Sequence, residues 1–431
     1  MTRFKLWPLP FFYGWIIVGV VFLAEFTVAG MGTITISLFF KPMGDDLGWS
    51  LTTLTGAVAV QALVGIAISP IFGILLDRFG ARLIMLFGAL IAGIGLLSLS
   101  LVQEIWQFWI LYAIVGAFGL HELGSLTGPV VVAKWFIKRR GRAMAIATLG
   151  TTIGGMVMAP VIGLLIAEIG WRRTWGAMGI CVMALMIPTV TILMRRQPED
   201  LGLVPDGYRS VKTYKKEELK KKGGFGPATD IRETEESWTL QEAFRTRTFW
   251  LLILAINLVG FSAGAINIHT VPFFTQEQGI SVQAASFVVT LRLLGASLSR
   301  IPWGLVVERV PVRQCLAVLF AVRAFGPLSL VFVPYPYNIF SFAVFYGLLG
   351  GSLGLLQPIA FANYYGRTFF GSIQGAIRPL LALPQVIGPL LVAGLYDRTG
   401  TFELAFIIAA VVSMVASGIV LLISVPVRSR A

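Results

Sequence analysis

Twelve long runs of mostly apolar residues follow one another along this chain, and they constrain its fold more than any other feature. Each run holds about 20 residues or more, which lets a helix cross the roughly 30 Å hydrocarbon core of a bilayer. Their length and continuity predict an all-α membrane protein with twelve transmembrane helices. The predicted spans cover residues 11–39, 50–76, 81–101, 105–133, 142–168, 174–194, 248–275, 281–307, 314–333, 337–362, 370–396 and 402–425.

The composition agrees with a membrane location. Of the 431 residues, 56% are hydrophobic and 13% are charged, whereas about a quarter of the residues of a soluble domain are charged. The first run is too long for a signal-peptide core and lacks a small-residue cleavage site, so we expect it to remain as a helix. Cys181 and Cys315 both fall inside predicted helices, where we expect packed residues rather than a disulfide or a metal site.

The net charge of +13 is distributed unevenly along the chain. With the N-terminus placed inside, fourteen Lys and Arg residues lie in short inner segments and twelve lie in the central linker. The predicted outer segments contain only Lys41, Arg172, Arg173 and Arg398. This asymmetry obeys the positive-inside rule. It predicts a multi-pass protein of the cell (inner) membrane with both termini cytoplasmic, and it argues against nucleic acid as the partner of the basic residues.

The apolar pattern is interrupted once, over residues 195–247. The first part of this stretch is rich in Lys and Glu and predicts a solvated linker. Residues 237–244 predict a short amphipathic helix on the inner membrane surface, with Trp238 and Phe244 as apolar anchors. We therefore expect a six-helix bundle over residues 1–194, a cytoplasmic linker over 195–247, and a second six-helix bundle over 248–431.

The two predicted bundles repeat one inner-loop pattern, G-x-x-x-[D/E]-R-x-x-x-R. It spans residues 73–82 after the second apolar run and residues 304–313 after the eighth. The charged positions, which we expect to form ion pairs that break when a carrier rocks, are Asp77, Arg78, Arg82, Glu308, Arg309 and Arg313. Internal repeats of this kind are typical of secondary transporters, whose substrate site lies between the halves. The loop resembles the inner-loop signature of the major facilitator superfamily.

Further motifs resemble a narrower family, the bacterial branch of the monocarboxylate porters, close to oxalate/formate-type antiporters. They begin with Phe12-Tyr13-Gly14-Trp15 and continue through Lys134-Trp135-Phe136 to His269-Thr270-Val271-Pro272 and Arg300-Ile-Pro302. The resemblance implies that Arg300, on the eighth helix, binds the substrate carboxylate, and that His269 contacts substrate. Eukaryotic members add a lysine and an aspartate, but Thr33 or Ile34 and Ala296 stand at those positions here. The resemblance therefore does not imply the proton relay that the family usually has.

Few charges fall within the predicted spans, and each is a functional hypothesis because burying it in a membrane is costly. The first bundle holds Glu25, His121 and Glu122, and the second holds His269, Arg292, Arg300, Arg323 and Arg378. This separation suggests that the second bundle binds an anion and the first handles protons. Arginine suits the anion because it stays charged and grips a carboxylate in a bidentate fork.

Several of these residues keep two interpretations. Arg292 could bind substrate or be a structural ion-pair partner. Arg378 could be a second anion contact or a charge at the inner end of its helix. Arg323 is expected to be structural, because its helix is peripheral in the superfamily, and Tyr346 is either a hydroxyl donor or a core aromatic. An unpaired Glu25 could carry a proton, whereas a paired one would be structural. His121 and Glu122 point about 100° apart, so only one of them is expected to line the cavity.

These features favour a secondary transporter over an enzyme. The sequence holds no phosphate-binding loop, zinc motif or nucleophile elbow, so we expect neither a cofactor nor a metal. The favoured hypothesis is proton-coupled symport of a small monocarboxylate such as lactate or pyruvate. The alternative is antiport of a dicarboxylate such as oxalate. A transporter-like sensor or an exporter of lipophilic drugs is a third, less favoured class. We expect a monomer in the lipid bilayer.

Overall fold

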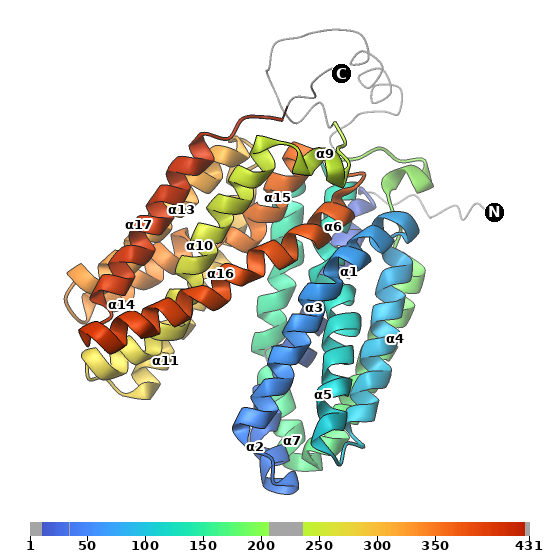
Figure 1. The fold of residues 1–431 in the computed structure, drawn as a ribbon. Coiled ribbons are helices and arrows are strands. Elements are labelled where there is room, and N and C mark those ends of the chain that lie inside the picture. Colours follow the sequence, from blue (N-terminus) through green and yellow to red (C-terminus); the bar gives the residue numbers. More distant parts are fainter. Residues whose placement is uncertain (1–10, 34, 207–235, 427–431) are drawn as a thin grey trace. The chain divides into compact units, whose positions relative to one another are not determined.

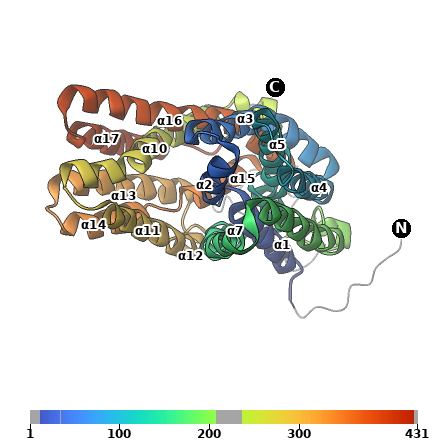
Figure 2. The ribbon, with the colours of Figure 1, turned by 90° about the horizontal axis from the view of Figure 1, so that it is seen from below.

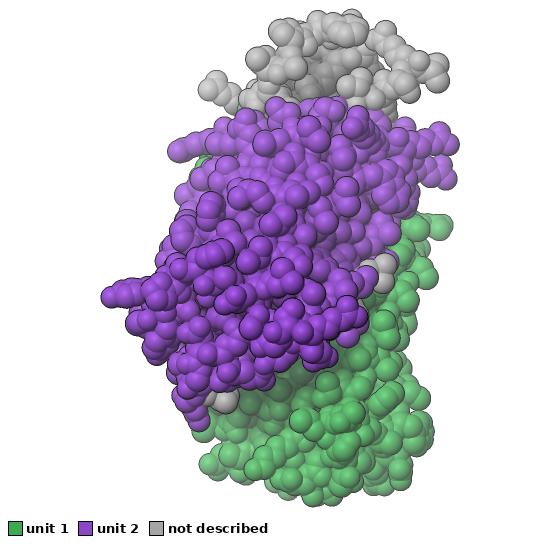
Figure 3. All heavy atoms as spheres, turned by 60° about the vertical axis from the view of Figure 1, so that its left-hand side comes forward, with its two compact units in different colours: residues 1–234 green, residues 235–431 purple. Residues whose placement is uncertain are grey.

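The computed structural model describes residues 11–33, 35–206 and 236–426. These residues form two compact units, divided between Thr234 and Glu235 (Figure 3). Both units are built from helices (Figure 1). Eleven helical stretches in the described part of the chain are long and apolar enough to cross a membrane.

Unit 1 contains the first of these stretches. Its helices are α1 (Gly14–Val28), η1 (Ala29–Thr33), α2 (Ser37–Leu47), α3 (Leu51–Phe79), α4 (Ala81–Leu99), α5 (Ile105–Ile114), η2 (Val115–Ser125), α6 (Thr127–Trp135), α7 (Arg140–Leu193) and the short η3 (Pro198–Leu201). Helix α1 packs against α7, and α4 packs against both α7 and η2. The segments η1 and η2 are π-helical. The span that begins with α1 and the span that begins with α5 therefore each change from α-helical to π-helical winding partway along.

Helix α7 is 54 residues long, or about 80 Å at the α-helical rise, far more than one bilayer crossing needs. Its backbone leaves the helical conformation at Gly170, with φ 79° and ψ 162°. A residue with a Cβ is strained at this φ, so glycine allows the chain to turn there. Gly170 therefore divides α7 into two spans, which brings the number of crossings in the described chain to twelve.

Unit 2 contains the remaining stretches. Its helices are α9 (Leu240–Phe244), α10 (Arg247–Pro272), η4 (Phe273–Glu277), α11 (Val282–Leu298), α12 (Arg300–Val306), α13 (Val312–Phe332), α14 (Tyr337–Phe342), η5 (Ala343–Leu349), α15 (Leu353–Tyr365), α16 (Phe370–Thr399) and α17 (Glu403–Leu421). Helix α10 packs against α16 and α17, and α13 packs against α17 and η5 (Figures 1 and 2).

Hydroxyl side chains start several of the spans. The Ser50 hydroxyl accepts a hydrogen bond from the Thr53 amide at the start of α3, and the Thr246 hydroxyl accepts from the Phe249 amide at the start of α10. Such caps satisfy backbone donors that have no partner inside the helix. They explain why α3 begins directly after Ser50 and α10 directly after Thr246.

The short helix predicted on the membrane surface is present as α9, with a capping box between Thr239 and Glu242. Trp238, however, is buried: its amide donates to the Tyr365 carbonyl oxygen at 2.9 Å, and the two rings meet edge to face. Trp238 thus anchors this segment to unit 2 and is not a lipid anchor. Both cysteines were expected to be packed inside helices. Cys315 is buried, but Cys181 on α7 is exposed, so the expectation is wrong for Cys181.

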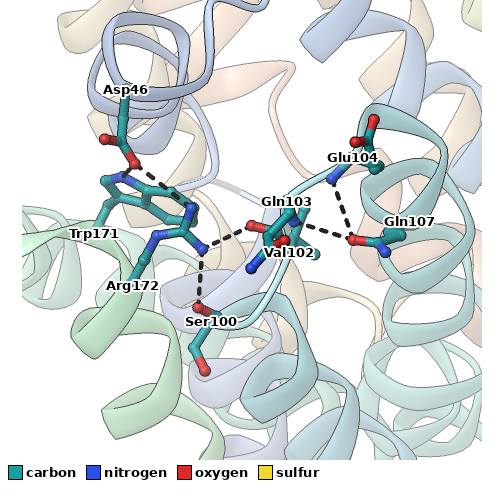
Figure 4. Close-up of polar contacts among 8 residues, drawn as sticks. All are labelled: Asp46, Ser100, Val102, Gln103, Glu104, Gln107, Trp171 and Arg172. Atoms are coloured by element: carbon teal, nitrogen blue, oxygen red, sulfur yellow. Dashed lines mark hydrogen bonds and ion pairs between the residues drawn. The ribbon is translucent and has the colours of Figure 1, made fainter.

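One end of unit 1 is fastened by a polar network around Arg172 (Figure 4). Arg172 Nη1 donates to the carbonyl oxygens of Val102 at 2.7 Å and Ser100 at 3.3 Å, and its guanidinium lies 4.3 Å from the Trp171 ring centroid. The Trp171 indole donates to Asp46 Oδ2 at 3.2 Å. The network joins the end of α2, the turn after α4 and the α7 turn, so two neighbouring crossings of α7 are held to the rest of the unit.

The membrane span formed by α14, η5 and α15 is interrupted. Gly350 has φ −96° and ψ 0°, and α15 begins only at Leu353. The break frees backbone carbonyls, which need donors in an apolar interior. Trp303 Nε1 donates to the Leu349 oxygen at 2.8 Å, and Arg323 Nη1 donates to the Gly350 oxygen at 2.9 Å. Side chains of two neighbouring helices therefore stabilise the interrupted span.

We predict that Gly347→Ala destabilises unit 2. A Cβ at Gly347 would lie 2.6 Å from the Arg292 backbone oxygen on α11, where no flexible side chain can move aside. Overpacking of this kind costs about 1–3 kcal/mol, so the thermal unfolding midpoint of the purified protein should fall by several degrees. Gly394→Ala on α16 is the control, because no heavy atom lies within 4 Å of its added Cβ. Equal midpoints for the two variants would contradict the close packing of α11 and η5.

Candidate functional site

Glu25 lies in the interior of unit 1, on α1, with 6% of its surface exposed. The Thr151 hydroxyl on α7 donates to Glu25 Oε2 at 3.0 Å. A Cβ added to Gly128 on α6 would come within 3.2 Å of Glu25 Oε1, so the carboxyl group sits where α1, α6 and α7 meet. The acid predicted to carry a proton is thus held by a hydroxyl donor in a tightly packed crossing.

His121 and Glu122 both lie on the π-helix η2, but the structure separates their surroundings. His121 lines a small cavity of about 40 Å³ together with Gln61, Tyr112 and Ser125. Glu122 is fully buried and lies outside that lining. The volume is enough for a few water molecules among these polar groups. Of the two neighbours, His121 is therefore the one on a cavity of unit 1.

Arg323 is the centre of a polar cluster in unit 2. It lies on α13 with 7% of its surface exposed, about 16 Å along the helix from Val312. Its Nη2 donates to the Tyr346 hydroxyl at 2.6 Å, and its guanidinium carbon lies 4.0 Å from the Tyr346 ring centroid. A cation close to an aromatic face is stabilised by the ring's charge distribution. Tyr346 itself is almost completely buried and stacks on Phe342.

Arg292 reaches the same ring from α11. Its guanidinium carbon lies 5.9 Å from the Tyr346 ring centroid, and its Nη1 donates to Asn267 Oδ1 on α10 at 2.7 Å. Arg292 lies about 15 Å along α11 from Val282, close to the middle of a bilayer crossing. Tyr346 thus brings two cations from different helices together.

The two cations have no acidic counter-ion among the described residues of unit 2. Among the residues that the structure describes, neither Arg292 nor Arg323 contacts an Asp or Glu side chain, and the Nε atom of each is buried without a hydrogen-bond acceptor. A buried ion is costly unless it is paired. The cluster therefore offers two positive charges to an anion.

The other predicted contacts of unit 2 are more dispersed. His269 lies on α10, and its Nδ1 is hydrogen-bonded to the Ala265 carbonyl oxygen at 2.9 Å. Its ring packs against the Phe402 ring, so the structure does not bring His269 into the arginine cluster. Arg300 is half-buried and begins α12, beside Ser299, whose hydroxyl is hydrogen-bonded to that of Ser352. Arg378 is half-buried near the start of α16, directly before Pro379.

The inner-loop pattern of unit 1 forms a buried ion pair. Lys134 Nζ on α6 lies 3.1 Å from Asp77 Oδ1 on α3, and both side chains are less than a tenth exposed. Arg196 Nη2 donates to the Asp77 backbone oxygen at 2.6 Å. By contrast, Arg78 and Arg82 are exposed.

The corresponding charges of unit 2 lie nearer the surface. Glu308 is half-buried, and Arg309 and Arg313 are exposed. Arg313 Nη1 donates to the Ile423 backbone oxygen at 3.2 Å, so this arginine connects the start of α13 to the end of α17. The repeated sequence pattern is thus used differently in the two units.

Three contributors, Asn267, Thr151 and Gln61, carried no signal in the sequence because neutral polar residues are common in spans. Arg323 was expected to be structural, and its hydrogen bonds to Gly350 and Tyr346 agree with that expectation. Lys134 was quoted as part of a motif without its partner. Within the described ranges, no group of three or more His, Cys, Asp or Glu residues lies close enough to hold a metal ion.

Comparisons with known proteins agree with this architecture. Residues 21–276 and 252–431 each match the sequence model of the Major Facilitator Superfamily. Human monocarboxylate transporter 1 is 22% identical over 448 residues, which cover 97% of this chain and 86% of that protein. Monocarboxylate transporter 12 of Rattus norvegicus is 24% identical over 421 residues, covering 95% and 85%.

Solved structures show the same fold at low sequence identity. The E. coli fucose:proton symporter FucP has a TM-score of 0.67 and 12% identity, covering 95% of this chain and 98% of its own. The human organic anion transporter MFSD10 (TETRAN) has a TM-score of 0.62 and 15% identity, covering 94% and 99%. The predicted all-α membrane fold is confirmed by these likenesses.

We predict that Lys134→Met destabilises unit 1 by about 3–5 kcal/mol, because it leaves the Asp77 carboxylate buried without its ammonium partner. The measurement is thermal unfolding of the purified protein, with the exposed Lys41→Met as the control. In the double variant with Asp77→Asn, much of the loss should be recovered, since the buried carboxylate charge is then removed together with the ammonium charge. Additive effects of the two substitutions would show that the pair is not coupled.

Proposed function

Because the chain belongs to the major facilitator superfamily, we propose that this multi-pass secondary transporter carries a small organic anion, most simply a monocarboxylate together with a proton. The observation that carries the proposal is the pair Arg292 and Arg323, which lie within 6 Å of the Tyr346 ring centroid at mid-depth and have no acidic partner in the part of the chain that the structure describes. A carboxylate satisfies such a site because it neutralises charge and accepts several hydrogen bonds.

The proposed substrate contacts lie in unit 2. Arg300 is the carboxylate partner that the monocarboxylate-porter resemblance implies, and Arg292 and Tyr346 supply the charged and aromatic part of the site. His269 and Arg378 complete the proposed set from α10 and α16. The names of the relatives support this substrate class, because two of them are monocarboxylate transporters and one solved structure is an organic anion transporter.

The proposed proton path lies in unit 1. Glu25 is held by Thr151 in the helix interior, and His121 lines a cavity that has room for water. Glu122 follows His121 directly and is the second buried acid. Carboxyl and imidazole groups exchange protons most readily when their surroundings bring their pKa near the working pH. The positive-inside distribution of Lys and Arg supports cytoplasmic termini and an inner-membrane location.

We expect the wild-type protein in liposomes to acidify the lumen when lactate or pyruvate is added outside, because a proton enters with each carboxylate. Arg300→Ala should abolish this protein-dependent acidification, whereas the exposed Arg398→Ala should retain it. An internal pH dye gives the rate, and empty liposomes give the leak. Wild-type liposomes that take up labelled lactate without acidification would overturn proton symport and leave anion transport standing.

A second candidate function, dicarboxylate exchange, is favoured by the same pair of arginines, since two cations suit two carboxylates. It also agrees with the resemblance to oxalate/formate-type antiporters. Under this candidate Arg378 is a second anion contact, so Arg378→Ala should abolish oxalate or malonate exchange in preloaded liposomes and affect lactate uptake only mildly. Equal losses for mono- and dicarboxylates would remove the distinction on which the candidate depends.

A further inference from the structure

Arg323 has no role in the set of contacts that the sequence suggested, yet it is the most buried cation of the unit 2 cluster. Its helix, α13, was expected to be peripheral. The Arg323 guanidinium lies on the Tyr346 ring, which Arg292 also approaches. Two arginines therefore approach one tyrosine ring, and their hydrogen bonds distinguish the roles of the two.

The hydrogen bonds of Arg292 leave one edge of its guanidinium available. Nη1 is used by Asn267, but no described residue accepts a hydrogen bond from Nε or Nη2. These two atoms form the side-on fork that matches the two oxygens of a carboxylate. A buried N–H without an acceptor costs free energy, and a bound carboxylate recovers it. Arg292 is therefore the better placed of the two arginines to bind an anion.

The hydrogen bonds of Arg323 are arranged differently. Both terminal nitrogens are used inside the protein, Nη1 by the Gly350 oxygen and Nη2 by the Tyr346 hydroxyl. Arg323 is also more deeply buried than Arg292, so its guanidinium is the less accessible of the two to a ligand. It holds the interrupted span and the tyrosine in place, and its positive charge remains without an acidic counter-ion among the described residues.

We propose that Arg323 is a positioning and charge-selecting residue of an anion subsite on Arg292, whose charge raises the affinity of unit 2 for small divalent carboxylates more than for monovalent ones. The inference rests on the proposed function, because it assigns the charge preference of the same site. The carboxylate is bound side-on by the Nε and Nη2 atoms of Arg292. Arg323 acts through space and through Tyr346, and it does not touch the substrate.

The physical reason is Coulombic. Both guanidinium groups lie within 6 Å of one ring centroid, in a setting of low dielectric constant where charges are weakly screened. The attraction between Arg323 and a ligand scales with the ligand charge, so a dianion gains about twice what a monoanion gains. Loss of the charge at position 323 therefore changes the ratio of the two affinities. Loss of packing alone would weaken both anions equally.

The test is equilibrium binding of radiolabelled malonate and lactate to the full-length protein in nanodiscs of zwitterionic lipid at neutral pH. Arg292→Gln should weaken both anions at least about tenfold, because it removes the fork. Arg323→Gln should lower the malonate-to-lactate affinity ratio at least about threefold. Arg323→Lys keeps the charge and should keep the ratio, although both affinities fall because lysine cannot hold Tyr346 and Gly350 together.

Arg398→Gln, an exposed arginine of the same unit, is the matched control and should bind as wild type. An unchanged ratio in Arg323→Gln, or a ratio lost in Arg323→Lys, overturns the charge-selecting role. Unchanged affinities in Arg292→Gln, or no saturable binding of either anion to the wild type, overturn the subsite. Should Arg323→Gln not yield monodisperse protein, Arg323→Met removes the same charge and replaces it in the comparison with Arg323→Lys.

The proposed function can fail separately. Wild-type liposomes that transport no carboxylate, in a protein whose malonate binding depends on Arg292 and Arg323, would reject the transport proposal and retain the subsite. Carboxylate transport by the wild type together with binding unaffected by either substitution would retain the function and reject the inference.

Discussion

The hydrogen bonds of Arg323 connect the backbone of one membrane span to the chemistry of the site. An interrupted helix in an apolar setting frees carbonyl oxygens, and each needs a donor. Arg323 supplies one at Gly350 and Trp303 supplies another at Leu349. The same guanidinium fixes the Tyr346 hydroxyl and lies against its ring. The interruption of the span, the buried cation and the position of the tyrosine therefore depend on one side chain.

Close helix packing brings the second arginine to this point. Gly347 lies so near α11 that an added Cβ would meet the Arg292 backbone, and Gly295 on α11 faces the Leu348 amide in the same way. Small residues at both sides of a crossing allow backbones to approach. Because α11 passes η5 at this short distance, the Arg292 side chain reaches Tyr346 and Asn267. Packing and charge are thus parts of one arrangement, and neither could change alone.

The fold was largely predictable, because span length and hydropathy are local properties of the sequence. The twelve crossings follow from them, including the pair that Gly170 separates within α7. The site was less predictable, because it depends on which residues of different helices meet. The π-helices η2 and η5 rotate His121, Glu122 and Tyr346 away from the positions of a regular α-helix. For the same reason the partnership of Arg323 with Tyr346 had no signal beyond an arginine within an apolar run.

The distribution of buried charge gives a physical reason for the proposed anion and proton to move together. In unit 2, two arginines lack acidic partners among the described residues, so the site is most costly when no anion is bound. In unit 1, Glu25 is buried, and the Thr151 hydroxyl donates a hydrogen bond to its carboxyl group. A carboxylate adds one negative charge to the membrane interior, and a proton adds one positive charge. Carried together they add no net charge, and this favours joint movement of the two because net charge in the membrane is costly.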